Sequence, residues 1–294
     1  MDTHKKGIIV YLLIAFGLAW FLWEIPLRIG LSPDNPLFQL AILPGAFAPA
    51  VGTVVVRKWV TREGFRDAGL RINLRQWRYY LAGWFLPLMV VAVITLLAVF
   101  LAITYPDFTL QRALRELIPD GTPRPSLPPG IFVLLPFQLM IVALVATPIL
   151  WGEEFGWRGY LQIRLMRNRP LLAAISTGLI WGLWHLPLIL RGYNFPGQPL
   201  LGMFVFMVSA VMLSIIFGWL RVRTGSIWSA SLAHSATNAV GGSLTLLLFM
   251  GGPNWIFVSY VGVLAWVPLG IICAWIAATG QLTESSGISD SNAP

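Results

Sequence analysis

The chain contains few charged residues. Only 11% of its 294 residues are Asp, Glu, Lys or Arg, whereas 57% are hydrophobic. Soluble domains usually contain about a quarter charged residues. A water-soluble core could not bury this much apolar side-chain surface, so the composition excludes an ordinary soluble protein. It predicts a protein whose solvent is largely the lipid bilayer.

Cysteine is also scarce. The single Cys273 excludes an intramolecular disulfide and a zinc site built from cysteines. The sequence contains no His-Glu-x-x-His pattern, no Gly-x-Ser-x-Gly pattern and no pair of Asp residues within its apolar runs. These absences argue against a zincin-like metalloprotease, a serine hydrolase with a nucleophile elbow, and an intramembrane aspartyl protease.

Long apolar runs, by contrast, are abundant. A helix needs about 20 apolar residues to cross a bilayer. Residues 8–29, 37–56, 80–103, 131–151, 171–190, 200–220 and 255–278 meet this requirement. An eighth stretch, 226–250, has more Ser, Thr and Gly, whose small size favours close helix packing. We therefore expect an all-α, polytopic bundle of about eight transmembrane helices, with one domain over residues 1–282 and a disordered tail over 283–294.

Positive charges are distributed unevenly between the connections. If the N-terminus is cytoplasmic, all but five of the 20 Lys and Arg residues lie in cytoplasmic segments. The five are Arg28, Arg112, Arg115, Arg124 and Arg191. Segments rich in Lys and Arg stay in the cytoplasm, so we expect both termini there. Without a targeting segment, a prokaryotic plasma membrane is the expected location, and the net charge of +8 requires no nucleic-acid partner.

Three groups of polar residues lie within the apolar runs. The first contains Glu153, Glu154 and Arg158, the second His185, and the third His234 and Asn238. Ionisable groups at membrane depth are costly and usually face a bundle interior or a water-filled cavity. The segment of about 131–250 is therefore the expected core of a buried polar site.

These residues also lie at similar predicted depths. Four of them are 11 to 15 residues from a basic residue or proline that marks a cytoplasmic helix end: Glu153, His185, His234 and Asn238. At a rise of 1.5 Å per residue, the separation is roughly 16–22 Å. We therefore expect the polar side chains to meet at one level of the bundle.

Helical spacing suggests how the side chains are arranged. Glu154 and Arg158 are four residues apart and can pair on one face. Glu153 is rotated by about 100° and can face a different neighbour. His234 and Asn238 are also four residues apart, so their side chains should point in one direction. A carboxylate, a histidine and two aligned hydrogen-bond donors can together activate a water and stabilise an oxyanion.

In these motifs the chain resembles the CAAX-protease and bacteriocin-processing (CPBP, or Abi) family of membrane endopeptidases. The family pattern is Glu-Glu-x-x-x-Arg, then Phe-x-x-x-His, then His-x-x-x-Asn or Asp. The sequence matches it within about residues 150–242. One position departs from the pattern, because Trp181 stands where Phe is usual. Three motifs in the right order on three predicted spans make the resemblance specific.

The resemblance implies a glutamate-dependent intramembrane endopeptidase. Glu153 would be the general base for a water, assisted by His185. His234 and Asn238 would stabilise the oxyanion. The implied substrate is a membrane-associated peptide or protein, such as a prenylated C-terminal CAAX peptide or, in bacteria, a peptide precursor or self-immunity target.

The need for a cofactor stays open at this stage. The family has been called a metalloprotease family, and whether a metal takes part is disputed. Glu153, His185 and His234 could supply three ligands to a divalent metal such as zinc, with an open fourth position. His234 would then not be an oxyanion donor. Glu154 and Arg158 would hold the site together with or without a metal.

Three other functions fit the same residues. A non-catalytic scaffold or immunity protein of the same fold would tolerate the loss of Glu153, and a transporter would lose substrate flux with it. The sequence shows neither the inverted repeat nor the paired broken helices found in many transporters. His185 and His234 could also ligate a haem.

Overall fold

The computed structural model describes residues 2–283 except 32, 34, 36, 129, 167 and 253. Within these residues every regular element is a helix, and none is a strand. The predicted all-α fold is therefore confirmed. The predicted tail over 283–294 lies outside the described residues apart from Thr283.

Six helical stretches are long and apolar enough to cross a membrane. They comprise α1 (Thr3–Arg28); α2 (Phe38–Ala46), α3 (Ala48–Val55) and the π-helix η1 (Val56–Val60); the 3₁₀-helix η3 (Leu74–Gln76) and α4 (Trp77–Phe100); α6 (Ile131–Gly156) and the π-helix η4 (Trp157–Leu161); α9 (Pro199–Thr224); and α12 (Trp255–Val258), the 3₁₀-helix η6 (Val263–Ala265) and α13 (Trp266–Ala278).

The other two predicted spans are shorter or interrupted. The first is α7 (Pro170–Trp184), which stops before His185 and is followed by the short α8 (Leu186–Ile189). The second consists of α10 (Ile227–Ala236), the π-helix η5 (Thr237–Gly242) and α11 (Ser243–Phe249). Together with the six long stretches, these two are compatible with the predicted number of about eight. The 3₁₀-helix η2 (Arg66–Ala68) and α5 (Gln111–Leu117) lie in connections.

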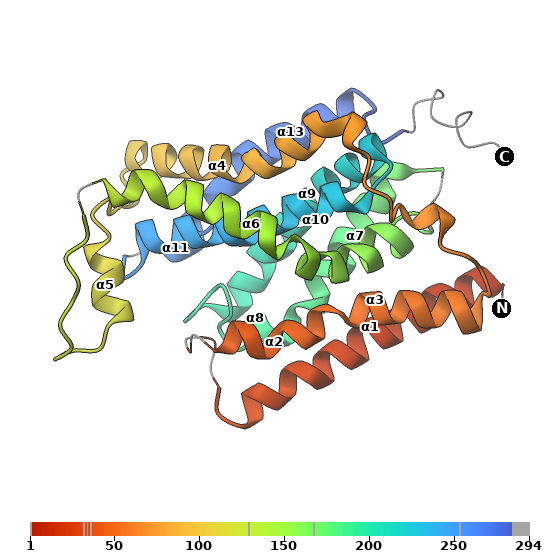
Figure 1. Ribbon diagram of the computed structural model, residues 1–294, viewed down its shortest axis with the longest axis horizontal. Coiled ribbons are helices and arrows are strands. Elements are labelled where there is room, and N and C mark those ends of the chain that lie inside the picture. The colour runs from red at the N-terminus through yellow and green to blue at the C-terminus, as the bar shows by residue number, and fades with distance from the viewer. Residues whose placement is uncertain are drawn as a thin grey trace.

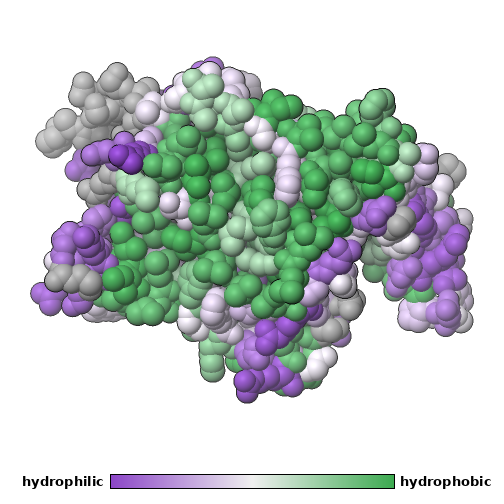
Figure 2. Space-filling view, turned by 180° about the vertical axis from the view of Figure 1, so that it is seen from behind, coloured by the Kyte–Doolittle hydropathy of each residue, from purple (hydrophilic) through white to green (hydrophobic). Residues whose placement is uncertain are grey.

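The surface has the distribution expected of a membrane protein. Figure 2 shows a broad hydrophobic band, with hydrophilic surface at both ends of the molecule and along part of its lower edge. Large apolar side chains such as Leu13, Phe137, Val145 and Ile271 are more than half exposed. In Figure 1, α1 begins and α13 ends at the same end of the bundle, and α5 lies at the other. The chain is an integral, multi-pass membrane protein.

Small residues allow the central helices to approach closely. A Cβ added to Gly178 of α7 would lie 2.6 Å from the Cα of Val211 on α9. The Ser214 hydroxyl on α9 donates a 2.8 Å hydrogen bond to the Ala174 carbonyl on α7. Between α10 and α6, the Ser235 hydroxyl donates to a carbonyl oxygen at 2.7 Å. Such contacts bring α6, α7, α9 and α10 together around the polar residues.

Candidate active site

A buried carboxylate joins the first and third motifs. Glu154 Oε1 accepts a 2.9 Å hydrogen bond from Nη1 of Arg158, one turn further along the chain. The same oxygen lies 2.9 Å from Nδ1 of His234 on α10. The side chains of Glu154 and Arg158 are fully buried, and His234 is almost so. The structure therefore contains the ion pair that the spacing predicts, and the pair also reaches a second helix.

Glu153 contacts a different helix, as its position on α6 suggests. Its Oε2 accepts a 2.9 Å hydrogen bond from Nε1 of Trp181 on α7. Glu153 is 6% exposed and Trp181 is 3% exposed. The two consecutive carboxylates of α6 are thus held separately, one by α7 and the other by α10.

His185 lies at the point where α7 ends. Its Nδ1 is 2.9 Å from the backbone carbonyl oxygen of Trp181. Since a carbonyl oxygen can only accept, Nδ1 carries the hydrogen and donates it. Nε2 of the neutral imidazole then remains available as an acceptor. The ring packs against Trp184 and Phe206, with centroids 4.9 Å away in each case.

Aromatic rings enclose the polar groups. The ring centroid of Trp181 lies 5.1 Å from that of His234 and 5.6 Å from that of His185. The guanidinium carbon of Arg158 lies 5.1 Å from the Trp181 centroid and 5.2 Å from the Phe217 centroid. Phe217 also stacks on His234. These cation–π and ring contacts stabilise the buried cation and restrict both imidazoles.

Asn238 and His234 differ in burial, although they are four residues apart. The α-helix ends at Ala236 and continues as the π-helix η5, in which each turn takes more residues. His234 is buried, whereas Asn238 is exposed. Among the described residues, no partner hydrogen-bonds to the Asn238 side chain. The structure therefore brings together Glu153, Glu154, Arg158, His185 and His234 through Trp181 and leaves Asn238 at the margin.

The residues do not form a three-ligand metal group in this arrangement. No three His, Cys, Asp or Glu side chains within the described ranges converge to hold a metal ion. Each imidazole uses Nδ1 for a partner within the protein, and Trp181 donates to Glu153 Oε2. Because Glu153, His185 and His234 do not converge as a three-ligand set among the described residues, the proposed reaction involves no metal.

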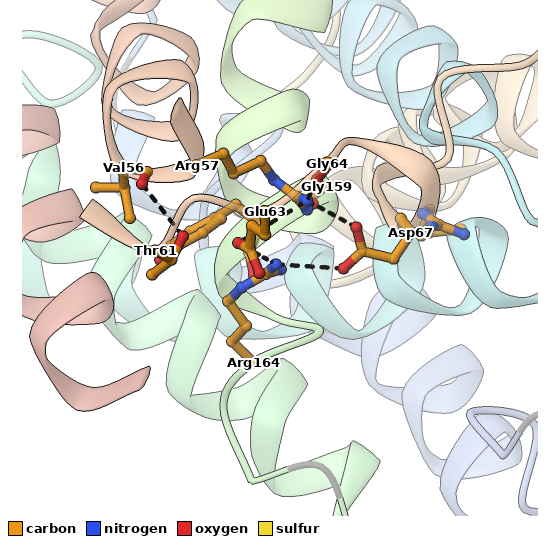
Figure 3. Close-up of polar contacts among 10 residues, drawn as sticks. Val56, Arg57, Thr61, Glu63, Gly64, Asp67, Gly159 and Arg164 are labelled. Atoms are coloured by element: carbon orange, nitrogen blue, oxygen red, sulfur yellow. Dashed lines mark hydrogen bonds and ion pairs between the residues drawn. The ribbon is translucent and has the colours of Figure 1, made fainter. Parts of the chain in front are cut away.

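A charged cluster anchors the helix that carries the two glutamates (Figure 3). Arg57 is fully buried and donates hydrogen bonds to Oδ1 of Asp67 at 2.7 Å and to the carbonyl of Gly159 in η4 at 3.0 Å. Arg164 contacts Oε1 of Glu63 at 2.5 Å and Oδ2 of Asp67 at 3.3 Å. The Arg57 cluster, which we define as Arg57, Glu63, Asp67 and Arg164, ties the loop after η1 to the segment that continues α6.

The charges of this cluster are mutually stabilising. Partial burial alone would raise the pKa of Asp67, but the hydrogen bond and charge of Arg57 and the charge of Arg164 outweigh it and lower that pKa. The sequence alone indicates only that Arg57 and Arg164 are positive charges of the expected cytoplasmic segments. The signal that could have revealed the cluster is the presence of Glu63 and Asp67 within an otherwise basic loop.

Two comparisons with known proteins bear on this site. A family model described as Type II CAAX prenyl endopeptidase Rce1-like matches residues 131–240. The matched segment runs from α6 into η5 and contains all three polar motifs. The chain is also similar to the CAAX prenyl protease 2 of Methanococcus maripaludis, with 26% identity over 247 residues. That similarity covers 81% of this chain and 85% of the archaeal protein.

Proposed function

Because this chain belongs to the CPBP family of CAAX-type membrane endopeptidases, we propose that it hydrolyses peptide bonds at membrane depth with Glu153 as the general base. The observation that supports this role best is the separation of the two glutamates. Glu154 is fully buried, with Arg158 and His234 both on its Oε1, whereas Glu153 is 6% exposed and accepts the hydrogen bond of Trp181 on Oε2. One carboxylate oxygen of Glu153 is therefore left to accept a proton from water.

The proposed reaction has two steps. Glu153 accepts a proton from water while the water oxygen attacks the carbonyl carbon of the scissile peptide, and the carbonyl oxygen becomes an oxyanion. The carbon–nitrogen bond then breaks, and the proton held by Glu153 passes to the departing amine. Nε2 of His185 assists by accepting a hydrogen bond from the same water. The products are one peptide with a new carboxyl terminus and one with a new amino terminus.

His234 and Asn238 are the proposed donors to the oxyanion. Nδ1 of His234 donates to the Glu154 carboxylate, so His234 serves as a donor through Nε2 as an imidazolium, with a hydrogen on each ring nitrogen. Asn238 is exposed and free of internal partners within the described chain, so its amide can reach an incoming peptide. Donors held ready for the developing negative charge lower the barrier of the attack.

The proposed substrate is a membrane-associated protein or peptide, with a prenylated C-terminal CAAX peptide as the first candidate. The name of the archaeal relative supports this class. A site at membrane depth between apolar helices also suits a substrate that reaches it from the lipid phase. In the proposed orientation, the end of the bundle at which α1 begins and α13 ends is cytoplasmic, in a prokaryotic plasma membrane.

The proposal can be tested in cells. Membrane peptides and new protein termini are compared between cells that express the native chain and cells that express Glu153→Ala at equal level. Fragments that appear only with the native chain support the protease and identify its substrate. Matching profiles, with a native phenotype that survives the substitution, would instead favour a non-catalytic scaffold.

A further inference from the structure

Trp181 contacts every polar motif of the site. Its indole N–H donates to Glu153, and its ring lies against both His185 and His234. Its backbone carbonyl accepts the hydrogen bond from Nδ1 of His185, and the guanidinium of Arg158 lies over its ring. One buried side chain on α7 therefore contacts α6 and α10 as well as the end of its own helix.

The hydrogen bond from Trp181 to Glu153 differs from the other indole hydrogen bonds of the described chain. Trp23, Trp84 and Trp184 each donate to a backbone carbonyl of another helix, which joins two helices without touching an ionisable group. The remaining indole donors likewise end on backbone carbonyls or on the Ser209 hydroxyl. The bond from Trp181 ends on a carboxylate, and that carboxylate is the proposed base.

We propose that Trp181 is a positioning residue for the reaction, and that its indole N–H orients the Glu153 carboxylate. This inference rests on the proposed function. A hydrogen bond to Oε2 fixes the rotation of the carboxylate about its last side-chain bond. Oε1 is then directed at the water, because the two oxygens lie on opposite sides of the carboxyl carbon. The indole N–H is only a donor, so it can hold the ionised base but cannot take its proton.

A phenylalanine at this position would separate the two roles of Trp181. The smaller ring could still pack against the imidazoles and Arg158, but it has no donor for Glu153. The chain therefore carries a hydrogen bond to its base that the Phe usual in the family pattern could not make. The loss of this bond should affect the chemical step more than substrate binding, since small displacements of a base are costly to rate.

The test uses Trp181→Phe, with Trp84→Phe as the matched control. Both substitutions remove one indole hydrogen bond to α6: Trp84 donates to the Met140 carbonyl at 3.0 Å, far along the helix from Glu153. The purified full chain is reconstituted in lipid vesicles, and kcat, KM and the unfolding temperature are measured with a farnesylated CAAX peptide. We expect Trp181→Phe to lower kcat by about ten- to a hundredfold with KM nearly unchanged, and Trp84→Phe to leave kcat near the native value.

A Trp181→Phe chain that keeps the native kcat would overturn the inference while leaving the role of Glu153 intact. A native chain without Glu153-dependent cleavage would instead reject the proposed function itself. If Trp181→Phe lowers the unfolding temperature, benzothienylalanine is placed at position 181, because it keeps the indole shape with sulfur in place of N–H. A lower kcat in this second chain supports the inference, and an unchanged kcat rejects it.

Discussion

Nδ1 of His234 lies 2.9 Å from Oε1 of Glu154, although the two residues are 80 positions apart in the sequence. The same oxygen accepts the hydrogen bond of Arg158. The carboxylate therefore neutralises a buried cation and also orients the imidazole that is proposed to contact the oxyanion. In the proposed mechanism, Glu154 thus has both a structural and a functional role.

Replacing Glu154 should affect both stability and activity. In Glu154→Ala, the fully buried Arg158 loses its ion partner, and His234 loses the group that orients it. Removal of one member of a buried pair costs about 3–5 kcal/mol in unfolding free energy. The change is measured by reversible unfolding in mixed micelles, together with peptide cleavage.

The matched control is Asp120→Ala, which breaks another pair with four-residue spacing, Asp120–Arg124, on the surface. An exposed pair contributes little because water solvates both charges. Equal losses of stability for Glu154→Ala and Asp120→Ala would contradict the role assigned to the buried pair.

Asn238→Ala should reduce turnover without destabilising the fold. The amide is exposed and has no internal partner within the described chain, so its removal leaves no buried group unsatisfied. Loss of one oxyanion donor lowers kcat by about 10²–10³-fold. Cleavage rate and unfolding temperature are measured on the same preparation. A native kcat in Asn238→Ala would exclude Asn238 from the oxyanion site.

Gly156→Ala should displace the helix that carries Glu153. A Cβ at this position would collide with Pro49 of α3 and lie 2.6 Å from the Tyr11 hydroxyl of α1. Neither helix can move away without disturbing the core, so we expect a lower unfolding temperature and lower activity. Gly17→Ala is the control, because a Cβ there has no heavy atom within 4 Å. Similar behaviour of both variants would show that the close approach at Gly156 is not required.

Acidification should weaken the Arg57 cluster. The pKa of Asp67 in the folded chain lies below its ordinary value of 3.8. Its contribution to stability is therefore fully present above that ordinary value, and it is lost as the pH falls from there through the lowered folded pKa. The unfolding temperature is measured from pH 6 to about pH 2, where native proteins lose such carboxylate contributions. As the pH falls, the unfolding temperature of Asp67→Asn should decline less steeply than that of the native chain. Parallel curves of unfolding temperature against pH would contradict this account.

Helical periodicity was sufficient to predict several parts of the site. The four-residue spacing placed Glu154 and Arg158 on one face, and the 100° rotation assigned Glu153 to another neighbour. Both relationships are present in the structure, although Arg158 lies in the π-helix η4 just beyond the end of α6. Hydrophobic runs likewise indicated the long spans, since each is dominated by apolar residues regardless of its neighbours.

Other features depend on how the helices pack and could not be derived from spacing. The π-helix η5 begins at Thr237, between His234 and Asn238, and the two residues differ in burial, since His234 is buried and Asn238 is exposed. The Trp181 hydrogen bond depends on the angle and height at which α7 meets α6. In the Arg57 cluster, Arg164 joins Glu63 and Asp67 from about 100 positions away, so these pairs are set by tertiary contacts.

The most direct test of the account is the cleavage activity of Glu153→Gln in lipid vesicles. Gln keeps the size of the side chain, and its carbonyl can still accept the Trp181 hydrogen bond, so the fold should be preserved. We predict that kcat for a farnesylated CAAX peptide falls by about 10²–10⁴-fold while the unfolding temperature stays near the native value. A Glu153→Gln chain that cleaves the peptide at the native rate would contradict the assignment of Glu153 as the base.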